Sequence, residues 1–307
     1  MTNTAASVNA KLREISRRSG EDMMTLQTRY VLERLLWRMC QTQWKDDIAL
    51  KGALIFVVYE GDIHRPTGDM DINGYDENGT IDTLDRIMRD ALAVECDDGV
   101  VFDLDSMMVR KERSWSQVKG GKVELFAKID RSEVRVRVDA GFGSAIVPSA
   151  KMMEYPSIIK DMPSACLKIY PFSTMISEKI HALVQHGAES SRLRDYYDIW
   201  SLSERYEFQG PILGEAIRSS FARFGTNLPA LPLDGLSEDF VDMRTDAWEK
   251  FRTSKGLRFK APNLEETVSK VRLFVEQAVI SAHGDDIGDW NPKKGWSHLE
   301  NTTGMTI

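Results

Sequence analysis

Apolar and polar residues recur with two different periods along this 307-residue chain, and the period changes near Pro163. Before Pro163, alternation predicts strands, and the segment 133–139 alternates strictly between valine and polar residues. After Pro163, apolar residues recur every three or four positions, as in amphipathic helices. The pattern predicts strands at about 69–74, 100–110, 121–129 and 133–139, and helices from about Ser19, over 48–59, 80–93, 173–186, 193–206, 211–224, 237–253 and 264–282.

This order of elements predicts an α+β protein with a separate helical part. We expect N-terminal helices and a mixed core over residues 1–165, followed by a helical lobe over 166–283. Residues 284–307 show no period and are expected to form an extended or mobile tail.

Composition narrows the class of protein. Hydrophobic residues make up 42% of the chain, enough for a substantial core, and the three cysteines form no C-x-x-C pair. No apolar run approaches the roughly 20 residues that span a bilayer, and the first residues lack a signal-peptide core. We therefore expect a soluble cytoplasmic protein with no membrane contact.

The net charge of −7 argues against a protein that coats nucleic acid, but it leaves room for a local basic groove. A basic cluster that does not bind nucleic acid is simply a solvated surface, and this is the favoured interpretation for the first of three basic clusters. The clusters are Lys11, Arg13, Arg17 and Arg18; Arg110, Lys111, Arg113, Lys119 and Lys122; and Arg192 and Arg194.

Candidate chemistry lies in the segment Arg65–Ile72. Residues i and i+2 of a strand point to one face, so Asp69 and Asp71 can converge on one hard cation. A third carboxylate, Asp139, ends the alternating strand in phase with its polar positions. A glycine turn at Gly52 precedes them. This order predicts a carboxylate triad on neighbouring strands, suited to a Mg²⁺ pair that holds a nucleoside triphosphate.

A calcium loop is the competing interpretation of the same residues. Asp69–Gly74 matches the first six positions of an EF-hand loop. The twelfth position, however, is Thr80 where a bidentate Glu is needed, and the eighth is Asp76 where an apolar residue belongs. Pro66 and Gly68 also stand where an entering helix would run, so the EF-hand is disfavoured.

The helical lobe carries three further charged residues of interest. Lys179 lies in an otherwise amphipathic helix, where a surface lysine is the ordinary interpretation. Asp195 and Asp198 are three residues apart and share one helix face, from which one can reach a neighbouring helix.

Taken together, these motifs resemble the AbiEii/MenT-type nucleotidyltransferase toxins of bacterial toxin–antitoxin systems. The resemblance covers about residues 30–205, and although each motif is weak alone, five in the right order are specific. The motifs are Lys51-Gly52, Arg65-x-Thr67-x-Asp69-x-Asp71, Val138-Asp139-x-Gly141-x-Gly143, Glu178-Lys179-x-x-Ala182-Leu183 and Arg194-Asp195-x-x-Asp198. It implies a polymerase-β-like nucleotidyltransferase core and a C-terminal helical lobe that closes over the nucleotide.

The resemblance also implies roles for single residues. Asp69 and Asp71 match the metal-binding carboxylates, and Asp139 matches a third that binds metal or acts as base. The Arg65 motif and Gly52, whose turn presents backbone N–H groups to phosphate, belong to the nucleotide site. Lys179 would meet the triphosphate, with Asp195 or Asp198 orienting it or contacting base or metal.

Two positions qualify this correspondence. Ala53 stands where the family usually has a second glycine or a serine, so only its backbone amide is left to contact phosphate. Thr67 matches a position that an antitoxin phosphorylates in relatives, which implies a regulatory site here; the alternative is that its hydroxyl caps the turn before the strand.

The expected activity is Mg²⁺-dependent transfer of a nucleoside monophosphate to an acceptor hydroxyl, with pyrophosphate released. By resemblance the acceptor is the 3′ end of a tRNA, the effect is arrest of translation and growth, and a separately encoded antitoxin is the partner. Two alternatives stay open: a nucleotidyltransferase that modifies a protein hydroxyl, and a non-catalytic relative that binds nucleotide or partner only.

Overall fold

The computed structural model describes residues 4–76, 79–111 and 120–298, which divide into two compact units. The N-terminal unit comprises residues 1–144 and 150–170, and the C-terminal unit comprises 145–149 and 171–307. The long segment of the C-terminal unit begins at Pro171, five residues after the start expected for the helical lobe, and residues 145–149 also belong to this unit.

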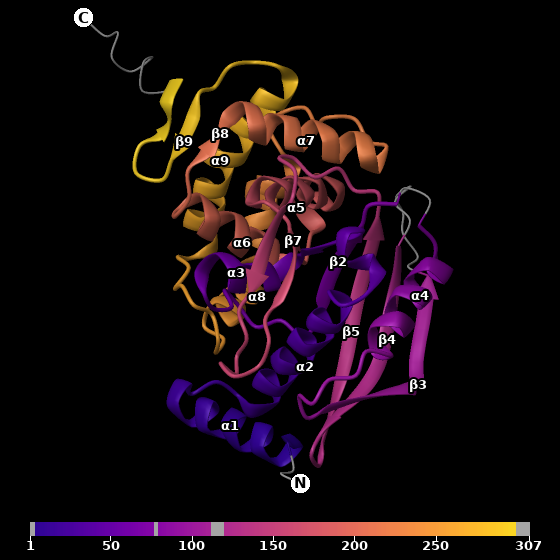
Figure 1. Ribbon diagram of the computed structural model, residues 1–307. Helices are drawn as coiled ribbons and strands as arrows, with labels where there is room; N and C mark the ends of the chain where they lie inside the picture. The colour runs from indigo at the N-terminus through magenta and orange to yellow at the C-terminus, as the bar shows by residue number, and fades with distance from the viewer. Residues whose placement is uncertain (1–3, 77–78, 112–119, 299–307) are drawn as a thin grey trace, which may run out of the picture. The chain divides into compact units, whose positions relative to one another are not determined.

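A seven-stranded mixed sheet forms the centre of the N-terminal unit (Figure 1). Its strand order is β3-β4-β5-β2-β1-β7-β6, in which the β2–β5 and β1–β7 pairs are parallel and the other pairs antiparallel. The strands are β1 (Ile48–Lys51), β2 (Met70–Gly74), β3 (Val100–Lys111), β4 (Gly120–Ile129), β5 (Ser132–Phe142), β6 (Lys151–Tyr155) and β7 (Ala165–Ile169).

Four α-helices accompany this sheet: α1 (Thr4–Ser19), α2 (Met23–Met39), α3 (Ile55–Glu60) and α4 (Ile81–Leu92). Helices α2 and α4 pack on the same side of the strands β3 to β5, α2 against β5 and α4 against β3 (Figure 1). The apolar face predicted for the second of these helices is buried in full, namely Leu26, Tyr30, Leu35, Leu36 and Met39.

Two local predictions for this unit were wrong, and three elements were missed. Residues 48–51 form strand β1 and not the start of a helix, because all but the last of these residues are buried and such a strand shows no alternation. The helix expected from Ser19 begins after Asp22, whose carboxylate accepts the Thr25 N–H at 2.9 Å. Helix α1 and strands β6 and β7 were not expected.

The C-terminal unit is mainly helical, as expected. Its helices are α5 (Phe172–His186), α6 (Leu193–Ser203), α7 (Gly210–Phe224), α8 (Glu238–Arg252) and α9 (Leu264–His283). A small antiparallel sheet joins β8 (Phe208–Gln209) to a hairpin of β9 (Asp289–Asn291) and β10 (Gly295–Trp296).

That hairpin corrects the expectation of an unpacked tail from residue 284. Trp290 and Trp296 are buried, and their rings lie 5.0 and 5.7 Å from the ring of Phe274 on α9. Aromatic contacts therefore anchor this segment, and the sequence shows no helical or strand period there that would have predicted them. Residues 299–307 lie outside the described part of the chain.

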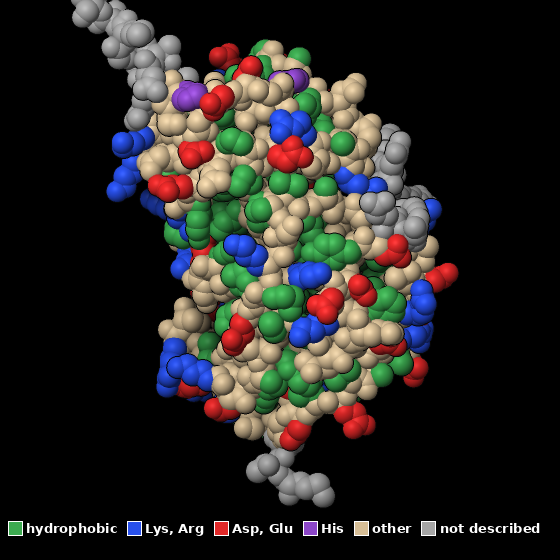
Figure 2. Space-filling model, turned by 45° about the horizontal axis from the view of Figure 1, so that its top comes forward, with side chains coloured by type: hydrophobic (Ala, Val, Ile, Leu, Met, Phe, Trp, Pro, Cys, Tyr) green, Lys and Arg blue, Asp and Glu red, His purple; other side chains and the backbone are tan. Residues whose placement is uncertain are grey.

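Basic and acidic side chains are both scattered over the face seen in Figure 2. Within the described residues, no helix combines the length and apolar character that crossing a membrane requires.

Candidate functional site

The glycine turn ends strand β1 and lies against the first candidate carboxylates. Gly52 follows Lys51 with φ of +68°, a left-handed conformation that suits glycine. A Cβ placed on Gly52 would lie 2.1 Å from Oδ2 of Asp71. No side chain therefore fits at position 52 while Asp71 keeps its place.

The candidate carboxylates come together on one face of two neighbouring strands. Asp71 on β2 and Asp139 on β5 are direct partners in the parallel register. Asp69 immediately precedes β2 and is two residues before Asp71, whereas Met70 between them is fully buried on the opposite face. The side-by-side placement predicted from the alternation is confirmed.

Two of these carboxylates pair with basic side chains. Arg137 on β5 lies 3.3 Å from Asp69, measured from Nη1 to Oδ1, and Lys122 on β4 lies 3.1 Å from Oδ2 of Asp139. All four side chains are between about a third and a half exposed. The pairs therefore lie at the surface, where solvent and ligands reach them.

The donor set fits Mg²⁺ by its chemistry. Carboxylate oxygens are the hard ligands that Mg²⁺ prefers, and solvent access suits an ion that keeps several waters. As the side chains stand, no three His, Cys, Asp or Glu residues in the described part of the chain converge closely enough to hold an ion. An ion at Asp69 and Asp139 would compete with the pairs to Arg137 and Lys122.

The other predicted residues of this segment have definite places. Ala53 is buried in the short 3₁₀ turn Gly52–Leu54, and Arg65 is also buried. Thr67 is partly exposed, and its hydroxyl donates to the backbone oxygen of Asp69 at 3.2 Å. The hydroxyl thus satisfies a backbone group beside the carboxylates, as the turn-capping alternative expects.

Lys179, Asp195 and Asp198 form a second cluster, within the C-terminal unit. The ammonium of Lys179 on α5 lies 2.6 Å from Oδ1 of Asp195 and 2.9 Å from Oδ2 of Asp198, both on α6. Arg192 adds a bond of 2.6 Å to the other oxygen of Asp195. The side chain of Lys179 is only 11% exposed, so the surface-lysine interpretation is wrong.

Electrostatics favour the charged form of Asp195. Burial alone would raise the pKa of Asp195, but Lys179 and Arg192 outweigh it and lower the pKa below its ordinary value of 3.8. Asp195 and Asp198 together hold the Lys179 side chain in one position.

Sequence reasoning missed the partners of the carboxylates. Arg137 appeared only as a polar position of the strand, and Lys122 and Arg192 only as members of basic clusters. Arg137 reaches Asp69 through the pairing of β5 with the distant strand β2, whereas Lys122 reaches Asp139 through the register of the consecutive strands β4 and β5. The alternation of residues 121–129, which places Lys122 on the polar face of a strand, was the one sequence signal available for this residue.

Comparisons with known proteins give one family match and two similar solved structures. Two solved structures resemble the fold, each with 13% identity and a TM-score of 0.46. JHP933 from Helicobacter pylori matches over 91% of this chain and 97% of its own chain. A candidate nucleotidyltransferase from H. pylori matches over 86% of this chain and 98% of its own chain. A search of curated proteins finds no match. The sequence model of the family described as "Nucleotidyl transferase AbiEii toxin, Type IV TA system" matches residues 34–269. That match spans well over half of the chain and includes both clusters, so the chain belongs to the AbiEii family of nucleotidyltransferase toxins.

Proposed function

We propose that this toxin transfers a nucleoside monophosphate from a nucleoside triphosphate to the 3′ end of a tRNA, in a reaction that depends on Mg²⁺. The observation that carries this proposal is the register of Asp71 with Asp139, beside Asp69 and the glycine turn. Carboxylates gathered on one solvent-reached strand face, next to a backbone turn, suit metal-assisted phosphoryl transfer.

In the reaction, the acceptor hydroxyl attacks the α-phosphorus. A new P–O bond forms, the bond to the β-phosphate oxygen breaks, and pyrophosphate leaves. Mg²⁺ ions, when bound, supply charge neutralisation and lower the pKa of the hydroxyl. Asp69 and Asp71 would hold them, and Asp139 would complete the hydroxyl side or take the proton.

The remaining family motifs supply the nucleotide contacts in this proposal. The N–H groups at Gly52 and Ala53 would donate to phosphate oxygens. Lys179 would meet the triphosphate as a compact point charge, held in position by Asp195 and Asp198.

The test is to incubate the purified protein with each α-labelled nucleoside triphosphate, Mg²⁺ and either total cellular RNA or a protein extract. Label in tRNA-sized RNA is expected, and it should vanish with EDTA. Label in protein alone would assign the acceptor to a protein hydroxyl. Nucleotide binding without any transfer would make the protein a binding-only relative, and the proposal would fail.

We further propose that the antitoxin controls the enzyme through Thr67. A phosphate there would add about −1.5 to −2 charges beside Asp69 and repel the incoming triphosphate. Mass spectrometry of the peptide that contains Thr67, after expression with and without the neighbouring gene, tests this. Relief of toxicity with Thr67 unmodified would show that inhibition takes another route.

A further inference from the structure

The strands β3, β4 and β5 present a charged face beside the carboxylates. On β5, alternation places Arg135, Arg137 and Asp139 on one side. On β4 it places Lys122 and Phe126 on the same side, because Lys122 is the register partner of Asp139 and Phe126 that of Arg135. Arg110 on β3 is the partner of Lys122. We name this surface the basic face, made of Arg110, Lys122, Phe126, Arg135 and Arg137.

Basic side chains of this face lie next to the candidate carboxylates. Lys122 pairs with Asp139 and Arg137 with Asp69, and Glu124 accepts a bond of 2.8 Å from Arg135. Glu124 has its pKa lowered, first by that hydrogen bond and then by the charges of Arg135, Arg110 and Arg137. Glu124 is therefore held in its charged form, where it fixes the Arg135 guanidinium and offsets one positive charge.

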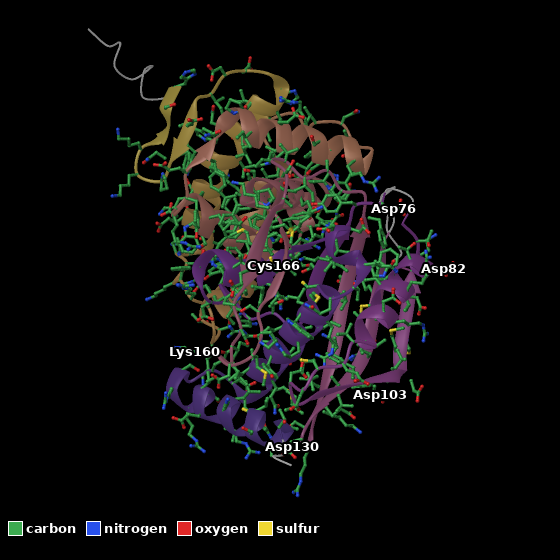
Figure 3. All side chains as sticks on the ribbon, in the orientation of Figure 1. Asp76, Asp82, Asp103, Asp130, Lys160 and Cys166 are labelled. Atoms are coloured by element: carbon green, nitrogen blue, oxygen red, sulfur yellow. The ribbon has the colours of Figure 1, made fainter. Side chains whose placement is uncertain are left out.

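Two more acidic positions of this face lie farther from Asp139 than Glu124 does. Asp103 is the register partner of Phe126, and Glu133 is six residues before Asp139 on β5. Asp103 lies toward the end of the strands that is marked by the turn residue Asp130, as Figure 3 shows. The face therefore carries both signs of charge along its length, with Arg110 and Lys122 in the row nearest the carboxylates.

An exposed aromatic ring lies between Arg135 on β5 and Asp103 on β3. Phe126 is 37% exposed, although it belongs to a strand whose alternate residues form the core. Its cross-strand neighbour Arg135 lies four residues from Asp139, which at the rise of a strand is about 13 Å. Exposed aromatic rings beside arginines are how sheet surfaces bind single-stranded RNA, by stacking bases and neutralising phosphates.

We infer that the basic face binds the single-stranded end of the acceptor RNA. One base stacks on Phe126, Arg135, Arg137 and Arg110 meet the phosphates, and the strand runs toward Asp139 so that its terminal hydroxyl reaches the carboxylates. This inference rests on the proposed function and adds to it the surface that receives the acceptor.

Binding is measured without Mg²⁺ or nucleotide, by the fluorescence anisotropy of a short single-stranded RNA labelled at its 5′ end. Phe126→Ala weakens binding roughly 10-fold or more, and Phe126→Trp retains it. Arg135→Ala lowers the slope of log affinity against log salt by about 1. Because both side chains are exposed, thermal unfolding should change little.

Matched controls lie outside the basic face. Tyr75 has the same exposed fraction as Phe126, 37%, and Arg13 is an exposed arginine of α1. Tyr75→Ala and Arg13→Ala should leave RNA affinity and its salt dependence unchanged. A loss of affinity equal to that of Phe126→Ala and Arg135→Ala would mean that binding is diffuse, and it would overturn the assignment.

The assay separates this inference from the proposed function. If the Phe126 and Arg135 variants bind RNA and transfer nucleotide to it as the wild type does, the basic face is not the acceptor surface, although the enzyme is an RNA nucleotidyltransferase. If the variants lose RNA binding and the wild type labels no RNA, the face binds RNA and the proposed reaction fails. If the variants bind RNA normally but lose a protein partner, the face belongs to that partner and the inference is overturned.

Discussion

Gly52 has no side chain, and the Asp71 carboxylate occupies the space that a side chain would fill. Gly52→Ala should abolish transfer, because its Cβ would lie 2.1 Å from the Asp71 carboxylate, and should also destabilise the fold. Gly61 is a matched control, since its φ of +77° is similar and nothing lies within 4 Å of its Cβ position. Gly61→Ala should lose only the backbone term, about 1–2 kcal/mol. Equal activity of both variants, measured with labelled nucleotide, would contradict this account.

Among the carboxylates, Asp71 gives the sharpest test of the metal proposal. Asp71→Asn keeps the shape of the side chain and removes its charge, so transfer should fall by about 100-fold or more while the melting temperature changes little. Asp82→Asn, an exposed carboxylate in the first turn of α4 that Figure 3 labels, should keep full activity. If Asp71→Asn transferred nucleotide as fast as the wild type, the assignment of Asp71 to the catalytic site would be wrong.

For Lys179, stability and binding can be separated. Lys179→Ala leaves Asp198, which is fully buried, without its ammonium partner and should lower the free energy of unfolding by about 3–5 kcal/mol. Adding Asp198→Asn should recover part of that loss but not the affinity for triphosphate. Urea denaturation and nucleotide titration measure the two quantities. If Lys179→Ala were as stable as the wild type, the buried ion pair between Lys179 and Asp198 would contribute nothing to the free energy of unfolding.

At the scale of elements, the hairpin of β9 and β10 shows how the C-terminal unit is closed by aromatic contacts. Trp296 is fully buried against Phe274, so Trp296→Ala should lower the free energy of unfolding by about 3–5 kcal/mol. Urea denaturation followed by circular dichroism checks this value. Leu273→Ala, which truncates an exposed side chain of the same helix, should cost far less. A small effect of Trp296→Ala would restore the expectation of an unpacked tail.

Sequence periodicity could predict those elements that have one buried and one exposed face. Strand β5 and helices α5, α7, α8 and α9 belong to this group, and so does the placing of Asp139 with the polar residues of its strand. Helix α6 was also predicted, although all of its residues from Asp195 to Ser203 are buried. Strand β1 could not be predicted, because burial on both faces removes the alternation. The pair Asp69–Arg137 was also out of reach, since it follows from the register of strands that are distant in sequence. The pair Asp139–Lys122 requires the register of the hairpin formed by β4 and β5, which alternation alone does not give.

For the whole molecule, membership of a nucleotidyltransferase toxin family implies a nucleoside triphosphate substrate and an antitoxin partner. Expression of the wild type alone should arrest growth, and co-expression of the neighbouring antitoxin gene should restore it. Asp71→Asn should be harmless at equal protein level, because inhibition depends on transfer. Growth curves with immunoblots check this. If the wild type transfers nucleotide but its expression does not slow growth, the transfer activity does not cause toxicity.

Because the toxin acts against its own host, the close contact between Gly52 and Asp71 also has a genetic consequence. Every missense change of a glycine codon creates a residue with a Cβ, and here no Cβ fits. Colonies that survive unopposed expression should therefore carry diverse substitutions at codon 52. At the aspartate codons, survivors should also be diverse, whereas codon 61 should seldom appear among them. The spectrum of spontaneous escape mutations would thus outline the site without any designed variant.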